Sequence, residues 1–380
     1  MINYLSLFSG IGAFEKAMNN LRIPFNLVGF SEIDKYASKS YSEIHGVPES
    51  MNLGDITKID ETKLPKIDFI TYGFPCQDIS IAGKQYGLLN EGGEKTRSGL
   101  FFDALRIIEH TQPVVAIAEN VKNLVSKKFN AQFRVVLASL ESVGYNNYWA
   151  VLNAKDYGVP QNRERVFIVS IRKDCDAGVF EFPKSYSLKL RLKDILESQV
   201  DEKFYLPNIQ LQKLQLKITD TLDTDKVMQI GNCRPTKNRK NPNQGRIYDI
   251  NGIAPCLNTK GGGNLEPHII KPKVIGGIGE KKSNDGQQWY QQDRIYDSDE
   301  IAISATTGFN PYYLTPDSEI RKLTPKEYFR LMGFKDEDFE KVERINSNTQ
   351  LYKQAGNSIV VDVAEELICM LFDEEGEFYI

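Results

Sequence analysis

GFPCQ, residues 73–77, follows an apolar run at 67–72 that predicts a buried strand. Pro75 lacks a backbone N–H and has a fixed φ, so the strand must end there and the Cys76 thiol lies on a stiff turn. Open α/β sheets bind their ligands at the carboxyl ends of strands. Cys76 is therefore a candidate nucleophile. A free cysteine is as often a small buried hydrophobe, and these five residues leave both interpretations open.

The composition indicates a globular protein. The chain has 380 residues, of which 41% are hydrophobic and 26% charged. This is ordinary usage for soluble domains, and the length suits about two of them. The sequence has no apolar run of about 18 residues and no signal-peptide pattern at its amino terminus. We expect a cytoplasmic, monomeric protein that does not bind membranes.

Cysteine and histidine usage favours neither disulfides nor a metal site. The five cysteines form no close pair, and the three histidines are equally scattered. Disulfide frameworks and zinc sites need such residues at short, regular spacings. We therefore expect no metal cofactor.

One segment carries an unusual charge pattern. The net charge is −4, which argues weakly against nucleic acid, but residues 226–248 carry six basic residues and no acidic one. Basic and amide side chains bind phosphates and base edges, whereas a solvated surface loop is the ordinary alternative. The basic residues are Lys226, Arg234, Lys237, Arg239, Lys240 and Arg246.

The amino-terminal motif predicts a site for a nucleoside without phosphates. An apolar run leads into Ser9-Gly10-Ile11-Gly12 and then a helical pattern. A dinucleotide fingerprint would need a glycine at position 15, where Glu15 would repel a pyrophosphate. Glu32 lies 22 residues (32 − 10) beyond Gly10, close to the spacing at which an acid binds ribose hydroxyls. With Asp55 available to an adenine amino group, the pattern favours an adenosine-type cofactor such as S-adenosylmethionine.

Further polar residues lie beside other predicted strands. Glu119 follows the strand predicted at 114–118, so its carboxylate can converge on Cys76. Arg163 and Arg165 precede another strand, where arginines are either plain surface charge or ligands for a phosphate or a carbonyl. Residues 80–99 contain five glycines and predict a loop that closes over a substrate.

Strand and helix patterns alternate up to about residue 172, which predicts an α/β, doubly wound parallel sheet. Residues 175–320 are loop-rich and contain a tandem repeat, at about 226–270 and 273–314, in which Arg-Ile-Tyr-Asp recurs identically. The repeat is either purely structural or part of a smaller lobe that reads the substrate, and we favour the second. Helical patterns return from 321, with Thr324 as N-cap and Pro325 at the first helical position. An apolar helix is expected to open at Gln354.

These patterns predict three parts. A catalytic domain spans 1–174 and is completed by 354–380. The smaller domain covers 175–320, and 321–353 forms connecting helices.

Six motifs, in order, resemble those of the bacterial and phage DNA (cytosine-5) methyltransferases. The likeness covers nearly the whole chain except about 175–320, where that family places its target-recognition domain. It implies a Rossmann-like methyltransferase domain that uses S-adenosylmethionine, yields S-adenosylhomocysteine and needs no metal. The motifs are Phe8-Ser9-Gly10-Ile11-Gly12, Gly73-Phe74-Pro75-Cys76-Gln77, Glu119-Asn120-Val121, Gln161-Asn162-Arg163-Glu164-Arg165, Arg321-Lys322-Leu323-Thr324-Pro325 and Gly356-Asn357-Ser358.

The resemblance also implies roles for individual residues. Cys76 would attack carbon 6 of a cytosine and Glu119 would hold its ring nitrogen. Arg165 would bind the carbonyl at carbon 2, supported by Arg163 through a phosphate or Glu119. The cofactor residues would be Phe8, Gly10, Ile11, Gly12, Glu32, Ile33, Asp55, Ile56, Phe74, Leu100, Asn357 and Ser358. The DNA-binding residues would be Gln77, Ser80, Lys84, Gln161, Arg234, Lys237, Arg239, Lys240 and Arg246.

The expected reaction is methylation at carbon 5 of a cytosine flipped out of double-stranded DNA, through a covalent Cys76 intermediate. The expected biological setting is restriction–modification or protection of phage or host DNA, with any cognate endonuclease not stably bound. Two alternatives remain: methylation of transfer RNA, and a non-catalytic protein that binds specific DNA sequences.

Overall fold

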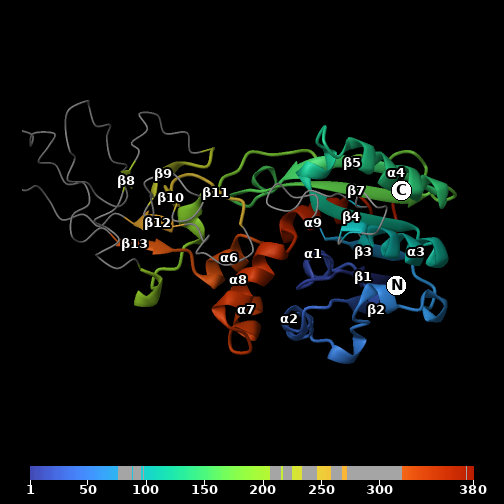
Figure 1. Ribbon diagram of the computed structural model, residues 1–380, viewed down its shortest axis with the longest axis horizontal. Coiled ribbons are helices and arrows are strands. Elements are labelled where there is room, and N and C mark those ends of the chain that lie inside the picture. Colours follow the sequence, from blue (N-terminus) through green and yellow to red (C-terminus); the bar gives the residue numbers. More distant parts are fainter. Residues whose placement is uncertain are drawn as a thin grey trace, which may run out of the picture. The chain divides into compact units, whose positions relative to one another are not determined.

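The computed structural model of the chain describes residues 1–75, 88, 96, 98–205, 215–216, 225–232, 246–257, 268–271, 319–373 and 375–380 (Figure 1). The chain divides into two units. The first comprises Met1–Val159, Arg163–Lys189 and Phe329–Ile380, and the second comprises Pro160–Asn162 and Leu190–Tyr328. The units therefore change at 189/190 and 328/329, whereas the sequence suggested changes at 174/175 and 320/321.

One mixed sheet organises the first unit. Among the described residues it has six strands in the order β2-β1-β3-β4-β7-β5 (Figure 1). The predicted doubly wound α/β fold is confirmed, but the expectation of a wholly parallel sheet was wrong for β7, which runs antiparallel to β4 and β5. The link from β5 to β7 is too short for the crossover that a parallel neighbour needs. The strands are β1 (Ile2–Leu7), β2 (Phe25–Ser31), β3 (Phe69–Tyr72), β4 (Val115–Val121), β5 (Tyr145–Asn153) and β7 (Glu164–Arg172).

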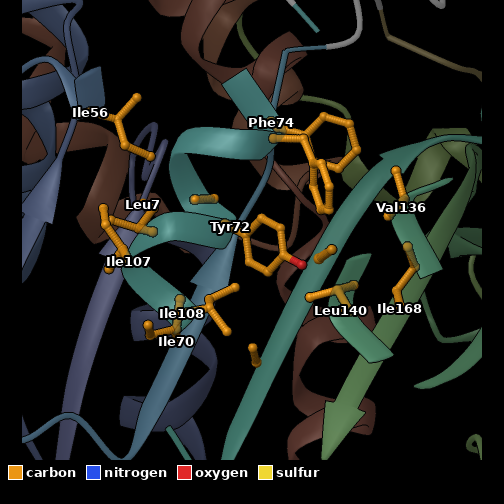
Figure 2. Packing of buried hydrophobic residues seen from close by; sticks show 14 of the residues in the cluster. Leu7, Ile56, Ile70, Tyr72, Phe74, Ile107, Ile108, Val136, Leu140 and Ile168 are labelled. Atoms are coloured by element: carbon orange, nitrogen blue, oxygen red, sulfur yellow. The ribbon is translucent and has the colours of Figure 1, made fainter. Parts of the chain in front are cut away.

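Helices cover both faces of this sheet. α1 connects β1 to β2 and α3 connects β3 to β4, and in the order β2-β1-β3-β4 these two connections run in opposite directions across the sheet. Right-handed crossovers then place α1 and α3 on opposite faces. α3 and α4 share one buried cluster with the strands, in which side chains from the sheet and the two helices point toward one another (Figure 2). The cluster includes Leu7, Ile70, Tyr72, Ile107, Ile108, Val136, Leu140 and Ile168. The helices named so far are α1 (Ala13–Leu21), α3 (Phe101–Thr111) and α4 (Asn130–Ser142).

The predicted helix start at Thr324 is confirmed. The Thr324 hydroxyl oxygen accepts a hydrogen bond from the Glu327 N–H at 3.2 Å, and Glu327 Oε2 accepts one from the Thr324 N–H at 2.8 Å. This reciprocal pair is a capping box. The helix expected to open at Gln354 was placed wrongly. Residue 354 lies near the end of α8, because the extended backbone at Ser358 ends that helix before α9 begins. The remaining helices are α2 (Lys35–His45), α6 (Pro325–Arg330), α7 (Asp336–Glu343), α8 (Asn348–Asn357) and α9 (Val361–Cys369).

The second unit is built from short strands, as the sequence predicted. Its described strands form a sheet in the order β13-β12-β10-β9-β8, and β6 pairs with β11. The second copy of the tandem repeat, 273–314, lies outside the described residues. The strands are β6 (Gln161–Asn162), β8 (Gln215–Leu216), β9 (Gln229–Asn232), β10 (Arg246–Tyr248), β11 (Ala254–Pro255), β12 (His268–Lys271) and β13 (Glu319–Lys322).

A buried ion pair stabilises this unit. Arg321 and Glu327 are 1% and 0% exposed, with Nη2 and Oε1 2.6 Å apart. The Glu327 carboxylate also accepts hydrogen bonds from the Thr324 and Glu197 N–H groups. Such a pair contributes little over an apolar substitute, but removing one partner leaves an uncompensated buried charge.

Replacing Glu327→Ala should therefore lower the free energy of unfolding of the second unit by about 3–5 kcal/mol, measured by urea unfolding. The double variant Arg321→Met/Glu327→Gln should recover most of this loss, because it removes both charges and the amide oxygen still accepts hydrogen bonds from backbone N–H groups. The matched control is Asp225→Ala, which removes an ion pair whose carboxylate is 76% exposed and should cost no more than about 1 kcal/mol. Equal losses in the two single variants would contradict this account.

Candidate active site

In the first unit, three parallel strands end at one row of paired residues, and the fourth, β4, crosses that row at Ala118 and ends at Val121. Leu7 of β1 pairs with both Ser31 of β2 and Tyr72 of β3. Tyr72 in turn pairs with Ala118 of β4. The next residue along each strand is Phe8, Glu32, Gly73 or Glu119. The register therefore brings the predicted cofactor residues and the predicted acid to one edge of the sheet.

Glu119 and Arg165 form an ion pair at this edge. Oε1 of Glu119 lies 3.0 Å from Nε of Arg165, and the two side chains are 13% and 17% exposed. Burial raises the pKa of the Glu119 carboxyl, while Arg165 and then Arg163 oppose that rise. Arg165 is oriented further because its Nη1 donates to the carbonyl of Glu164 at 2.8 Å. The pair thus combines a carboxyl that holds its proton more tightly than usual with a fixed cation.

The chain leading to the predicted nucleophile is held beside this pair. A Cβ at Gly73 would lie 3.6 Å from Oε2 of Glu119, so backbone and carboxylate are in contact distance. Asn120 Nδ2 donates to the carbonyl of Phe74 at 3.0 Å, which fixes the approach to Pro75. Asn120 is fully buried and its anchoring role was not predicted, although it belongs to a motif that was. Cys76, Gln77, Ser80 and Lys84 lie outside the described residues, so their roles stay predictions.

The loop between β1 and α1 has left-handed backbone at three positions. They are Phe8 (φ 53°), Gly10 (φ 56°) and Gly12 (φ 79°). A Cβ on Gly12 would lie 2.2 Å from Nε2 of His45, so this glycine serves packing against α2. A Cβ on Gly10 would meet no atom within 4 Å. Gly10 therefore borders open space in which a ligand can approach the backbone.

Glu32 closes this loop from the β2 side. Its Oε2 accepts a hydrogen bond from the Gly10 N–H at 2.9 Å, and its Oε1 accepts one from the Asp34 N–H at 2.7 Å. Burial raises the pKa of Glu32, and these two backbone bonds counteract it. Each carboxylate oxygen keeps a further lone pair for a hydroxyl donor. Ile33 is 76% exposed and offers an apolar surface next to this carboxylate.

Asn52 connects the two acidic segments, which sequence reasoning missed. Its Oδ1 accepts hydrogen bonds from the N–H groups of Glu32 at 3.1 Å and Gly54 at 2.8 Å, and its Nδ2 donates to the Glu32 carbonyl. Asp55 then caps a short 3-10 turn by accepting from the Thr57 N–H, a bond that lowers the pKa of Asp55. The sequence signal that could have identified Asn52 is the Asn-x-Gly spacing of residues 52–54, typical of a turn stabilised by a side chain.

The carboxy-terminal motif belongs to the same unit. Asn357 is exposed at the end of α8, whereas Ser358 is 6% exposed. Arg163 is 3% exposed and its Nη2 donates to the carbonyls of Gly356 and Ser358. Its charge lowers the pKa of Glu119 against the effect of burial, and the side chain is directed at the protein backbone rather than at a surface where a phosphate could bind.

The apolar residues predicted to contact the cofactor are mostly interior. Ile11, Ile56 and Phe74 are 1–2% exposed, and the ring of Phe74 packs on Phe101 with 5.5 Å between centroids. Leu100 is half-buried and precedes α3. These side chains therefore form the wall behind the site, and any ligand contact is limited to their edges.

Six of the nine residues predicted to bind DNA fall in the second unit, and two of these six, Gln161 and Arg246, are described. Gln161 is fully buried and its Oε1 accepts from the Leu257 N–H at 3.1 Å, a position that speaks against the expected DNA contact. Arg246 is half-buried on β10, where its hydrogen bond lowers the pKa of Tyr248 against the effect of burial. Arg234, Lys237, Arg239 and Lys240 lie outside the described residues.

The hydrogen-bond acceptors and the apolar side chain at the sheet edge suit a nucleoside cofactor. Open space at Gly10, the lone pairs of Glu32, the exposed Ile33 and the carboxylate of Asp55 match a methionine chain, ribose hydroxyls and adenine. In the part of the chain that is described, no three His, Cys, Asp or Glu side chains are grouped to hold a metal ion. None of the described helices is long and apolar enough to span a membrane.

Comparisons with known proteins point the same way. The sequence profile described as C-5 cytosine-specific DNA methylase matches residues 2–372. The orphan methyltransferase M.SPRI of Bacillus phage SPR is 35% identical, covering 99% of this chain and 99% of its own. The type II methyltransferase M2.ScrFI of Lactococcus lactis subsp. cremoris is 36% identical over 94% of this chain and 82% of its own. The solved Dnmt2 methyltransferase of S. pombe shares the fold, with a TM-score of 0.58, 19% identity and 97% coverage of both chains.

The Glu119–Arg165 pair predicts how stability depends on pH. The Arg165→Gln variant loses the cation that lowers the Glu119 pKa most. The Glu119 pKa, which burial already raises, therefore rises further. A carboxyl whose folded-state pKa exceeds its unfolded value stabilises fully below the unfolded pKa, and loses that contribution as pH rises through the folded pKa. The variant should therefore lose more free energy of unfolding, relative to wild type, at about pH 8 than at about pH 5.

Urea unfolding across this pH range measures the difference. The control is the same substitution in a Glu119→Gln background, where the cost of Arg165→Gln should no longer depend on pH. A pH-independent cost in the Glu119 background would show that the two charges are not coupled.

Proposed function

This chain belongs to the C-5 cytosine-specific DNA methylase family, and we propose that it transfers a methyl group from S-adenosylmethionine to carbon 5 of a cytosine in duplex DNA. The observation that carries the proposal is the Glu119–Arg165 pair, 3.0 Å apart, beside the Gly73 backbone that leads into Pro75 and Cys76. An acid, a cation and a nucleophile are the three groups that this substitution on a pyrimidine needs. The fold and the family support the same conclusion.

The chemistry explains why a nucleophile is required. Carbon 5 of cytosine is a poor nucleophile while the ring is aromatic. When the Cys76 thiolate forms a bond to carbon 6, the electron pair of the 5,6 double bond becomes available at carbon 5. Glu119 donates a proton to the ring nitrogen N3 as that charge develops, and Arg165 binds the carbonyl oxygen at carbon 2. The cofactor, when bound, supplies an electrophilic methyl group.

The second half of the reaction restores the protein. Once carbon 5 carries the methyl group, a base removes the proton from that carbon, and the electron pair re-forms the double bond. The carbon–sulfur bond breaks at the same time and Cys76 leaves as thiolate. N3 returns its proton to Glu119, so atoms and charges balance over the cycle.

The acidity of Glu119 suits this role. A general acid works best when its pKa lies near the operating pH, and such catalysis typically contributes about 10²–10⁴-fold. Burial raises the Glu119 pKa, and the arginines limit that rise. A carboxyl that is both buried and paired therefore keeps its proton more readily than an exposed one, without being permanently neutral.

The cofactor would be held by the edge of the sheet. Glu32 would accept hydrogen bonds from the ribose hydroxyls and Asp55 from the adenine amino group, while Ile33 covers the adenine ring. Gly10 would allow the methionine part to approach the backbone, and Asn357 would complete the site from α8. These groups orient the cofactor and do not take part in bond making.

Because the target carbon is inaccessible inside a duplex, the cytosine has to leave the base stack, at a cost of a few kcal/mol. We propose that the second unit reads the DNA sequence, with the basic segment 226–248 contacting phosphates and base edges. The names of the relatives, orphan and type II methyltransferases of phages and bacteria, support a role in DNA modification or protection.

The central test uses Cys76→Ser and a duplex with 5-fluorocytosine at the target. The variant should lose turnover yet bind S-adenosylhomocysteine with unchanged affinity, as measured by calorimetry. Fluorine cannot leave as a proton does, so wild type should stay joined to the duplex through Cys76, detectable by mass spectrometry. The control, Cys256→Ser, removes an exposed cysteine and should change neither property. Normal methylation without an adduct, or faster methylation of transfer RNA than of DNA, would overturn the proposal.

The glycine loop gives a separate test of the cofactor site. Gly10→Ala and Gly46→Ala both place a Cβ in open space at a left-handed backbone position, so each should cost about 1–2 kcal/mol of stability. Only Gly10→Ala should also weaken binding of S-adenosylhomocysteine, by about tenfold or more, because its Cβ enters the ligand's space. Equal affinities in the two variants, measured by calorimetry, would place the cofactor elsewhere.

A further inference from the structure

Arg163 is fixed at both its backbone and its side chain. Its N–H donates to Oδ1 of Asn153 at 3.0 Å, and its carbonyl accepts from the Ala154 N–H at 3.1 Å, which ties it to the end of β5. The side chain is 3% exposed. A buried guanidinium in a fixed position is expensive unless it has strong acceptors, so its partners define its purpose.

Its acceptors are two carbonyls at the end of α8. Nη2 donates to the carbonyl of Gly356 at 3.0 Å and to that of Ser358 at 2.7 Å. The last carbonyls of a helix have no partners within the helix and carry its negative partial charge. The two carbonyls flank Asn357, which is exposed. Of residues 356–358, Asn357 alone is exposed to a ligand, and the Arg163 guanidinium holds the backbone on both sides of it.

The interior beside this contact holds little free space. A cavity bordered by Arg163, Arg165, Ile359 and Val360 has a volume of about 10 Å³, close to the least that can hold one water molecule. Displacing the turn would therefore require Arg163 or its neighbours to move with it.

Arg163 also adjoins the pair formed by Glu119 and Arg165, because Arg163 and Arg165 line the same small cavity and Nε of Arg165 lies 3.0 Å from Oε1 of Glu119. Among the described residues, the charged groups that act on Glu119 are Arg165 and Arg163, and both lower its pKa against the effect of burial. Arg163 therefore contacts a turn contributed by the carboxy-terminal helices and adjoins the arginine that pairs with the Glu119 carboxyl on β4.

We propose that Arg163 is a positioning residue that fixes the 356–358 turn for the cofactor and links that turn to Glu119, rather than a residue that binds a DNA phosphate. The word cofactor here rests on the proposed function. Two properties of this one side chain can be tested separately. One is the two-carbonyl fork, meaning the pair of hydrogen bonds from Nη2 to the carbonyls of Gly356 and Ser358, and the other is the positive charge. Both bonds come from Nη2, and lysine retains the charge but is too short to carry an N–H donor to that position, so it loses this two-carbonyl fork.

Three variants separate these properties. Arg163→Met removes fork and charge, Arg163→Lys removes the fork alone, and Arg172→Lys is the matched control. Arg172 lies at the other end of β7 and its Nη1 donates to the carbonyl of Gln112. Each is measured by calorimetry with S-adenosylhomocysteine, by the pH profile of kcat, and by the salt dependence of the KM for DNA.

Both Arg163 variants should bind S-adenosylhomocysteine about 10- to 100-fold more weakly, the equivalent of losing hydrogen bonds to a charged group. Catalysis needs protonated Glu119, so kcat falls as pH rises through its pKa. That fall should move to higher pH in Arg163→Met, where a cation that lowers the pKa is gone, and stay in place in Arg163→Lys. Arg172→Lys should change neither, and the salt dependence should be the same in all three.

Two results would overturn the inference: wild-type affinity for S-adenosylhomocysteine in Arg163→Lys, or a reduced salt dependence in Arg163→Met, which marks a phosphate contact. If Arg163→Met does not fold, the affinity of Arg163→Lys alone decides. Failure of the wild-type protein to bind S-adenosylhomocysteine would instead contradict the proposed function, so the two failures are distinguishable.

Discussion

Backbone pairing holds Leu7 opposite both Ser31 and Tyr72, and Tyr72 opposite Ala118, and the candidate site depends on this register. Each strand continues beyond that row into a residue of the site. Because successive side chains of a strand point to opposite faces, a slip of one residue would carry Glu119 to the other face of the sheet. Because both faces of these strands are buried, such a slip would force the differently shaped side chains of both layers to repack, and this close packing fixes the register. The site is therefore specified by the core before any polar contact forms.

Polar groups at this edge are placed so that burial and pairing oppose each other. Glu32 and Glu119 are both buried enough for their pKa values to rise, yet each has partners that favour the charged form, backbone N–H groups for Glu32 and arginines for Glu119. The partners differ because the tasks differ. In the proposed function, Glu32 acts as a hydrogen-bond acceptor, which backbone N–H groups favour, and Glu119 exchanges a proton, which its raised pKa favours. Two carboxyls at one sheet edge thus acquire separate chemistry from their surroundings.

Sequence reasoning located the parts of the site that are local in the chain. Glycines, prolines and acids that directly follow apolar runs are visible in the sequence, and the capping of α6 by Thr324 needed only four residues. It failed where the partner is distant or the geometry is global. The direction of β7 depends on a connection between strands, and the interior role of Arg163 depends on carbonyls 193 and 195 residues later. Asn52 was missed because its one side chain makes four hydrogen bonds to separate segments, three to the backbone of Glu32 and Gly54 and one to the Ser38 hydroxyl.

The carboxy-terminal helices explain why so distant a segment belongs to the site. Lys16 of α1 pairs with Asp338 of α7 at 2.8 Å, and Lys353 of α8 pairs with Asp34 at the start of α2 at 2.5 Å. Asp34 also donates its N–H to Glu32, so α8 is joined to the acid proposed to bind the ribose through one residue. These contacts close a loop of more than 300 residues, and such closure is slow relative to local structure. The amino-terminal half of the site can therefore form early, while Asn357 joins it only when the chain's last helices have docked.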